Sequence, residues 1–363
     1  MAHVMVSTRK GLFEVKKRTK GWEVASADFL GDNVTLALHD LRDGTSYAAL
    51  NHGHFGIKLH RRDKGGKWVE ITSPTYPPKP EGLEDLDGWG KPVKWANQLI
   101  WSLEPGGADE PGVLWAGTMP GGLFRSKDRG KSWTMMRSLW DMPERNKWLG
   151  GGADLPGIHS ICVDPRSSKT VRVAISCGGV WTTHDGGKTW EQNAHGMHFD
   201  DGPTKADPHT QDPHMMVQCA AKPDRYWVQH HAGIYKSVDN AKSWQEMFAK
   251  PSSFGFGVVV HPKDPDTAWF VPGIKDEKRI PVGGALVVTR TRDGGKTFQS
   301  LKKGLPQKHA YDVVFRHALA LDKTGNRLAM GSTTGNLWIS ENQGDSWKLV
   351  SGTLPQVYAV RWV

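Results

Sequence analysis

The chain has 363 residues, of which 37% are hydrophobic and 23% charged, and its formal net charge is +9. This length and apolar content suffice for a packed core and exclude a chain that is disordered throughout. No apolar run is long enough to cross a bilayer, and the N-terminus lacks the basic segment and apolar stretch of a signal peptide. We therefore expect a cytoplasmic protein without a membrane span. The three cysteines show neither a disulfide framework nor zinc-ligand spacing.

Two residue counts stand out, 42 glycines and 17 tryptophans. Several of the tryptophans end copies of one repeat, whose pattern is Ser/Thr-x-Asp-x-Gly-x-Ser/Thr-Trp. The clearest copies are Ser126–Trp133, Thr183–Trp190, Ser237–Trp244 and Thr291–Phe298, and the weaker ones are Arg61–Trp68, Ser340–Trp347 and Gly21-Trp22. In this pattern the Asp side chain accepts bonds from nearby backbone N–H groups, and Gly supplies positive φ, so each copy predicts a tight hairpin.

The spacing of the repeats indicates the architecture. Their final aromatic residues fall at 22, 68, 133, 190, 244, 298 and 347. Each unit contains four short strand patterns, as in Ile158–Val163, Val171–Ser176, Gly179–Thr183 and the segment after Trp190. Four strands per unit at this period are typical of propeller blades. We therefore predict an all-β protein, a single seven-bladed β-propeller over residues 1–363.

The two ends of the chain are expected to complete one blade together. The first strand pattern, His3–Val6, corresponds to the second strand of a blade. The last pattern, Val357–Trp362, has the character of the missing inner strand. Pairing between them would close the ring and remove the exposed sheet edges of an open array.

The repeats resemble the Asp boxes, or BNR repeats, of sialidases, sortilin-type receptors, some xyloglucanases and photosystem assembly factors. More narrowly, Gln229–Ser237 and Phe254-Gly255-Phe256 resemble segments of bacterial BNR-repeat proteins that are named glycosyl hydrolases. The resemblance implies a sialidase-like propeller whose Asp boxes lie on the face opposite the active site. It implies a structural role for the Asp boxes and leaves the chemistry open, because one fold supports many functions.

The same resemblance implies that an authentic sialidase would carry three arginines, a Tyr-Glu nucleophile pair, an Asp acid and an early Phe/Tyr-Arg-Ile-Pro motif. Here Arg-Ile-Pro occurs only as Arg279-Ile280-Pro281, in the sixth blade. We therefore expect a protein of related fold that is not a sialidase.

Histidines gather at the predicted end opposite the Asp boxes, which we call the top. His159 and His214 begin inner strands, His230 and His231 lie at a top turn, and His54 occupies the matching place in the second blade. Three interpretations remain open. His159, His214, His230 and His231 bind one divalent metal ion whose identity is unknown; His159, His214 and His231 act as catalytic groups without a metal; or the histidines only cap strand ends.

Three long top loops cover residues 72–96, 135–157 and 191–213. They contain four tryptophans and ten acids, namely Trp89, Trp95, Trp140, Trp148, Glu84, Asp85, Asp87, Asp141, Glu144, Asp154, Asp200, Asp201, Asp207 and Asp212. Aromatic rings beside carboxylates are typical of a sugar-binding cleft, whereas the alternative is that they anchor loops. As substrate-binding residues we predict Trp95, Asn97, Trp148, Arg279 and His54, with Arg279 binding an anionic group.

Two functions from different classes fit these features. The favoured one is a hydrolase or lyase that acts on a small molecule or glycan in the top pocket, because titratable residues gather there. The alternative is a non-catalytic scaffold that docks a protein partner. Nucleic acid is not expected as a partner, since many of the basic residues are spread around the Asp boxes.

Overall fold

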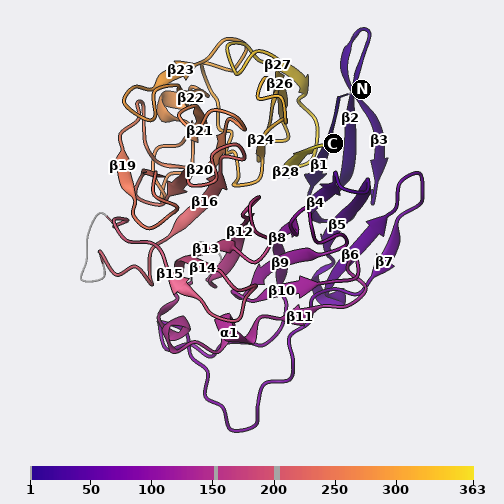
Figure 1. The fold of residues 1–363 in the computed structure, drawn as a ribbon. Coiled ribbons are helices and arrows are strands. Elements are labelled where there is room, and N and C mark those ends of the chain that lie inside the picture. The colour runs from indigo at the N-terminus through magenta and orange to yellow at the C-terminus, as the bar shows by residue number, and fades with distance from the viewer. Residues whose placement is uncertain (1, 151–153, 200–204) are drawn as a thin grey trace.

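The computed structural model describes residues 2–150, 154–199 and 205–363, and most of its regular structure is β-strand. Seven four-stranded antiparallel sheets surround one axis, as Figure 1 shows. From the axis outwards, the strands of the blades in chain order are β28 (Val357–Trp362), β1 (His3–Thr8), β2 (Gly11–Arg18) and β3 (Gly21–Asp28); β4 (Val34–Asp40), β5 (Thr45–Asn51), β6 (Ile57–Arg62) and β7 (Val69–Ile71); β8 (Leu99–Pro105), β9 (Leu114–Met119), β10 (Leu123–Ser126) and β11 (Thr134–Met135); β12 (Gly157–Val163), β13 (Val171–Ser176), β14 (Gly179–Thr183) and β15 (Glu191–Gln192); β16 (Pro213–Gln218), β17 (Tyr226–His230), β18 (Ile234–Ser237) and β19 (Gln245–Met247); β20 (Gly255–Val260), β21 (Ala268–Pro272), β22 (Val288–Thr291) and β23 (Gln299–Leu301); and β24 (Leu319–Leu321), β25 (Leu328–Gly331), β26 (Leu337–Ser340) and β27 (Lys348–Ser351).

The inner strands close a ring. Each contacts the next in the order β28, β4, β8, β12, β16, β20 and β24, and β24 contacts β28 again. In the first blade β28 pairs with β1, with Val360 opposite Val6, so the two ends of the chain lie close together (Figure 1). The predicted seven-bladed propeller and its closure by the terminal strands are confirmed.

Helices contribute little. They are α1 (Arg137–Trp140) and the short 3-10 helices η1 (Gly53–Phe55), η2 (Pro143–Lys147) and η3 (Val282–Gly284). None of the helices in the described part of the chain is long and apolar enough to cross a membrane.

The Asp boxes form the hairpins that the repeat predicts. In the fifth blade, Oδ1 of Asp239 accepts the Ser243 backbone N–H at 3.0 Å and the Ser237 hydroxyl at 2.8 Å. The Ser243 hydroxyl donates to its second oxygen at 2.5 Å. The box also contacts the turn that follows the inner strand of its blade, because the Asn240 N–H donates to the Asp224 carbonyl at 3.0 Å. Asp boxes and inner-strand turns therefore share one end of the channel, the bottom.

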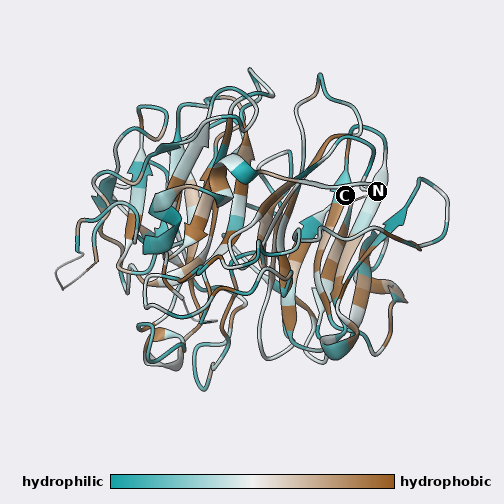
Figure 2. Ribbon diagram, turned by 90° about the horizontal axis from the view of Figure 1, so that it is seen from below, coloured by the Kyte–Doolittle hydropathy of each residue, from teal (hydrophilic) through white to brown (hydrophobic). Residues whose placement is uncertain are grey.

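The core lies between neighbouring blades. Trp115, Trp181, Trp227 and Trp269 stand on strands of four successive blades and are at most 2% exposed. Figure 2 shows hydrophobic residues concentrated along the strands, with hydrophilic residues in the connecting loops. The burial of these large rings accounts for the high tryptophan content.

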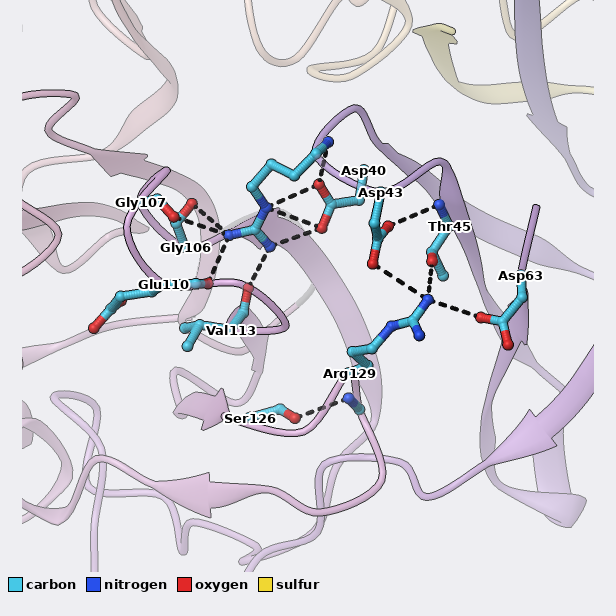
Figure 3. A network of polar contacts seen from close by, with 12 residues as sticks. Asp40, Asp43, Thr45, Asp63, Gly106, Gly107, Glu110, Val113, Ser126 and Arg129 are labelled. Carbon is cyan, nitrogen blue, oxygen red and sulfur yellow. Dashed lines mark hydrogen bonds and ion pairs between the residues drawn. The ribbon is translucent and has the colours of Figure 1, made fainter.

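Two arginines join the second and third blades at the bottom. Arg42 donates to the buried Asp40 at 2.7 Å and to four carbonyls of one turn of the third blade. The carbonyls belong to Gly106, Gly107, Glu110 and Val113, at 2.8–3.0 Å. From the Asp box of the third blade, Arg129 donates to Asp63 at 3.0 Å (Figure 3). The charged residues of this rim are therefore structural.

Candidate functional site

The top of the channel is shaped by β-bulges. In six inner strands the register shifts near the start, and the extra residues are Thr35, Trp101, His159, His214, Phe256 and Tyr358. A bulge leaves its extra residue unpaired and redirects the side chain. The extra residues of neighbouring blades meet around the channel: the rings of Trp101 and His159 are 5.5 Å apart, and those of His214 and Phe256 are stacked at 4.7 Å.

One carboxylate and two imidazoles converge in this region. Nε2 of His214 lies 3.4 Å from Oδ2 of Asp212, and Nδ1 of His231 lies 3.6 Å from the same oxygen. Asp212 and His214 are buried, whereas the His231 side chain is 33% exposed. The backbone N–H of His231 donates to the Asp212 carbonyl at 2.9 Å, which holds the top turn of the fifth blade against the start of β16. We call Asp212, His214 and His231 the top cluster.

Other groups fix the orientation of the top cluster. Oδ1 of Asp212 accepts the Ser176 hydroxyl at 2.9 Å and the Cys177 backbone N–H at 3.1 Å. Nδ1 of His214 lies 2.7 Å from the Gly255 carbonyl oxygen. A carbonyl oxygen only accepts hydrogen bonds, so Nδ1 carries the proton and Nε2 of the neutral ring presents its lone pair to Asp212.

Burial and charge set the ionisation of the cluster. Burial alone would raise the pKa of Asp212, but the charge and hydrogen bonds of His214, with a bond from His231 and the charge of Arg316, hold that pKa well below its usual range. Burial lowers the pKa of His214, and Asp212 offsets this only in part. At neutral pH the cluster therefore combines a carboxylate with a neutral His214.

His159 and His230 are close by but use both ring nitrogens elsewhere. Those of His159 lie 2.8 Å from the Ser160 hydroxyl and 2.6 Å from the Pro213 carbonyl oxygen. Those of His230 lie 3.1 and 3.0 Å from the backbone nitrogens of Asp212 and Ala232. Burial holds the pKa of His159 well below its usual value and lowers that of His230 to about 3. Of the four histidines predicted to bind a metal, the structure brings His214 and His231 together with Asp212.

The predicted substrate-binding residues are dispersed. Trp148 is fully buried, and the Trp95 indole N–H donates to Asp85 at 2.6 Å. Asn97 closes a loop by donating to the Pro74 carbonyl at 2.9 Å. The exposed His54 packs its ring on that of Phe55.

Arg279 is the predicted substrate-binding residue that reaches the neighbourhood of the top cluster. Its guanidinium lies 5.3 Å from the centre of the Phe256 ring and forms an ion pair with Asp276 at 2.5 Å. Because Phe256 stacks on His214, the loop that carries Arg279 lies beside the cluster.

Most of the loop acids stabilise loops. Asp85 pairs with Arg145, Asp141 pairs with Arg137, and Asp207 bonds to His209. Asp212 is the member of that set that joins the top cluster. Asp200 and Asp201 lie outside the described residues.

Arg316 is a further residue of the site, and the sequence gave no sign of it. Its guanidinium lies 4.7 Å from the Trp101 ring centre and 5.4 Å from that of Phe256. It lines an open cavity of about 290 Å³ with Thr35, Trp101 and Tyr358. The residue comes just before the inner strand of the seventh blade, at the end where other blades carry their bulges. Alignment of the inner-strand starts was the signal that would have found it.

Comparisons with known proteins agree with this architecture. Residues 123–136, in the third blade, match the BNR-Asp box repeat family. The chain is an Asp-box propeller. Over 269 residues it is 26% identical to a probable oligoxyloglucan-reducing end-specific xyloglucanase of Neosartorya fischeri, a match that covers 66% of the chain and 30% of that protein. The Asp-box propeller thus spans less than a third of this curated relative.

Solved structures show the same fold. The GH74 xyloglucanase of Xanthomonas campestris matches 96% of this propeller and 52% of its own chain, with a TM-score of 0.64 and 18% identity. YCF48 bound to a D1 peptide matches 94% of this propeller and 87% of its own chain, with a TM-score of 0.51 and 16% identity. At such identities the likeness extends to the fold alone.

Proposed function

We propose that this Asp-box propeller is a hydrolase that binds one divalent metal ion to Asp212, His214 and His231 and acts on a small molecule or glycan at the top of its channel. The observation that carries the proposal is the approach of two imidazole nitrogens to one carboxylate oxygen, at 3.4 and 3.6 Å. Two histidines and one carboxylate are a ligand set used by catalytic zinc and by non-haem iron.

The spacing fits a metal ion. Metal–nitrogen and metal–oxygen bonds of about 2.0–2.2 Å in tetrahedral directions place two ligand atoms about 3.3–3.6 Å apart. The lone pair of His214 Nε2 faces an ionised carboxylate, an arrangement that a cation between the two atoms stabilises. The bonds from Ser176 to Asp212 and from His214 to Gly255 are the outer contacts that orient metal ligands.

Three protein ligands leave a coordination position for water. A divalent metal lowers the pKa of its bound water to about 7, so a hydroxide forms by losing one proton to solvent. Its oxygen adds to the electrophilic centre of the substrate, the bond to the leaving group breaks, and the leaving group takes up one proton. The sum is the addition of one water molecule across the broken bond. The one-third exposed His231 faces the side from which substrate enters.

The distant relatives support a glycan as one substrate class. The curated relative is described as a xyloglucanase, and the same is true of the propeller from Xanthomonas campestris. The docking alternative rests on a different neighbour, since YCF48 was solved with a bound peptide. The convergence of titratable side chains in the channel favours the hydrolase.

Cobalt binding tests the proposal. Metal-free protein titrated with Co²⁺ should develop a visible absorption band at one equivalent, and His214→Ala and His231→Ala should each lose it while circular dichroism stays unchanged. His195→Ala is the matched control, because His195 is an exposed histidine of a top loop outside the cluster. Equal cobalt binding by all four proteins would refute the metal centre and favour docking.

A further inference from the structure

We infer that Arg316 is the receptor for a carboxylate group of the substrate, held beside the top cluster. The inference rests on the proposed function for its biological meaning and on Arg316 itself for its chemistry. Arg316 comes from the seventh blade, whereas the top cluster comes from the fifth, so substrate bound by both would lie across the channel.

The guanidinium of Arg316 lacks the partner that such a group usually has. Its Nε atom is fully buried and has no hydrogen-bond partner within the described residues, and no carboxylate among them pairs with the guanidinium. Burial lowers the pKa of Arg316 to about 10, so the group stays charged at neutral pH. A buried cation with unused donors is costly unless an anion completes it.

The surroundings leave the donors available to a ligand. Trp101 and Phe256 approach the guanidinium at 4.7 and 5.4 Å from their ring centres. Aromatic rings hold an arginine by attraction to its charge without consuming its N–H donors. The open cavity of about 290 Å³ provides room for a small ligand, with Asn33 and Asn51 on its wall. A guanidinium fork matches the two oxygens of a carboxylate.

The charge of the region agrees with an anionic ligand. Arg279 is already paired with Asp276, and Asp212 is occupied by the Ser176 and Cys177 donors. One divalent ion, one Asp212 carboxylate and one Arg316 guanidinium would sum to a net charge of about +2, which favours an anion.

Carboxylate binding can be measured without a metal or turnover. Metal-free protein is titrated with sodium acetate, sodium malonate and inorganic phosphate against sodium chloride of equal ionic strength, and melting temperature and NMR shifts are followed. Acetate and malonate should stabilise the wild type. Arg316→Gln and Arg316→Lys should weaken carboxylate binding at least tenfold, because lysine keeps the charge but loses the fork. Arg18→Gln, at an exposed hairpin, is the control.

The outcomes separate this inference from the metal centre. If the wild type binds no carboxylate, or Arg316→Lys binds it as well as the wild type, the inference fails even when Co²⁺ binding is intact. Binding of phosphate alone through Arg316 would overturn the carboxylate assignment. Arg316→Lys decides the matter if Arg316→Gln does not fold, and its Co²⁺ affinity should equal that of the wild type.

Discussion

The hydroxyl of Ser176 donates a 2.9 Å hydrogen bond to Oδ1 of Asp212. Together with the Cys177 backbone N–H, this bond occupies one oxygen of the carboxylate and leaves Oδ2 facing His214 and His231. Ser176 is therefore a positioning residue, because it fixes which oxygen the two imidazoles share.

Replacing Ser176 with alanine should weaken Co²⁺ binding about tenfold, since loss of an outer contact usually costs 10–100-fold in metal affinity. The expected measurement is a competition titration with a chelator. Ser102→Ala is a suitable control, because that buried hydroxyl bonds instead to the Ile158 carbonyl at 2.8 Å. Equal affinities for the two variants would assign Ser176 a purely structural role.

The blades were predictable because each is specified locally. The Asp239 hairpin closes through Ser237 and Ser243, all within seven residues, so the pattern that encodes it is visible in the sequence. The predicted bounds of the second and third strands of the fourth blade, Val171–Ser176 and Gly179–Thr183, coincide with β13 and β14 for the same reason.

The site was predictable only in part. His214 and His231 follow from their places at a strand start and a top turn. Asp212 joins them because a bulge at His214 and a backbone bond from His231 bring the three together, and neither appears as a pattern. Arg316 depends on contacts with the third and sixth blades, which a single sequence does not reveal.

His230 should make stability fall in mild acid. Burial lowers its folded pKa to about 3, whereas in the unfolded chain it is about 6.5, so between these values the unfolded state binds the extra proton. Stability is then lost as pH falls from about 6.5, by up to about 1.4 kcal/mol per pH unit for this group. His230→Gln should flatten the pH dependence of urea unfolding between pH 4 and 6. The exposed His184→Gln should not, and an unchanged slope in His230→Gln would disprove this assignment.

The Asp box of the fifth blade offers an internal comparison. Asp239→Ala removes acceptors for the Ser237 hydroxyl and for both Ser243 donors and should cost about 1–2 kcal/mol in urea unfolding. Asp239→Asn should cost less, because Asn342 accepts the Ser346 N–H at 3.0 Å in the corresponding box of the seventh blade. An asparagine variant as unstable as the alanine variant would show that the negative charge is essential.

Arg42 should be among the most important single side chains for the contact between the second and third blades. Arg42→Met would leave the buried Asp40 without its ion pair and deprive four carbonyls of the neighbouring turn of their donor. Breaking a buried pair typically costs about 3–5 kcal/mol, and the 20% exposure of Arg42 favours the lower end. Arg18→Met removes an exposed pair with Glu23 and should cost less than about 1 kcal/mol. Urea unfolding compares the two variants, and hydrogen exchange should show faster opening around residues 106–113 in Arg42→Met. Similar unfolding midpoints for both would mean that the rim contacts are solvent-screened and that packing of the blades alone holds this interface.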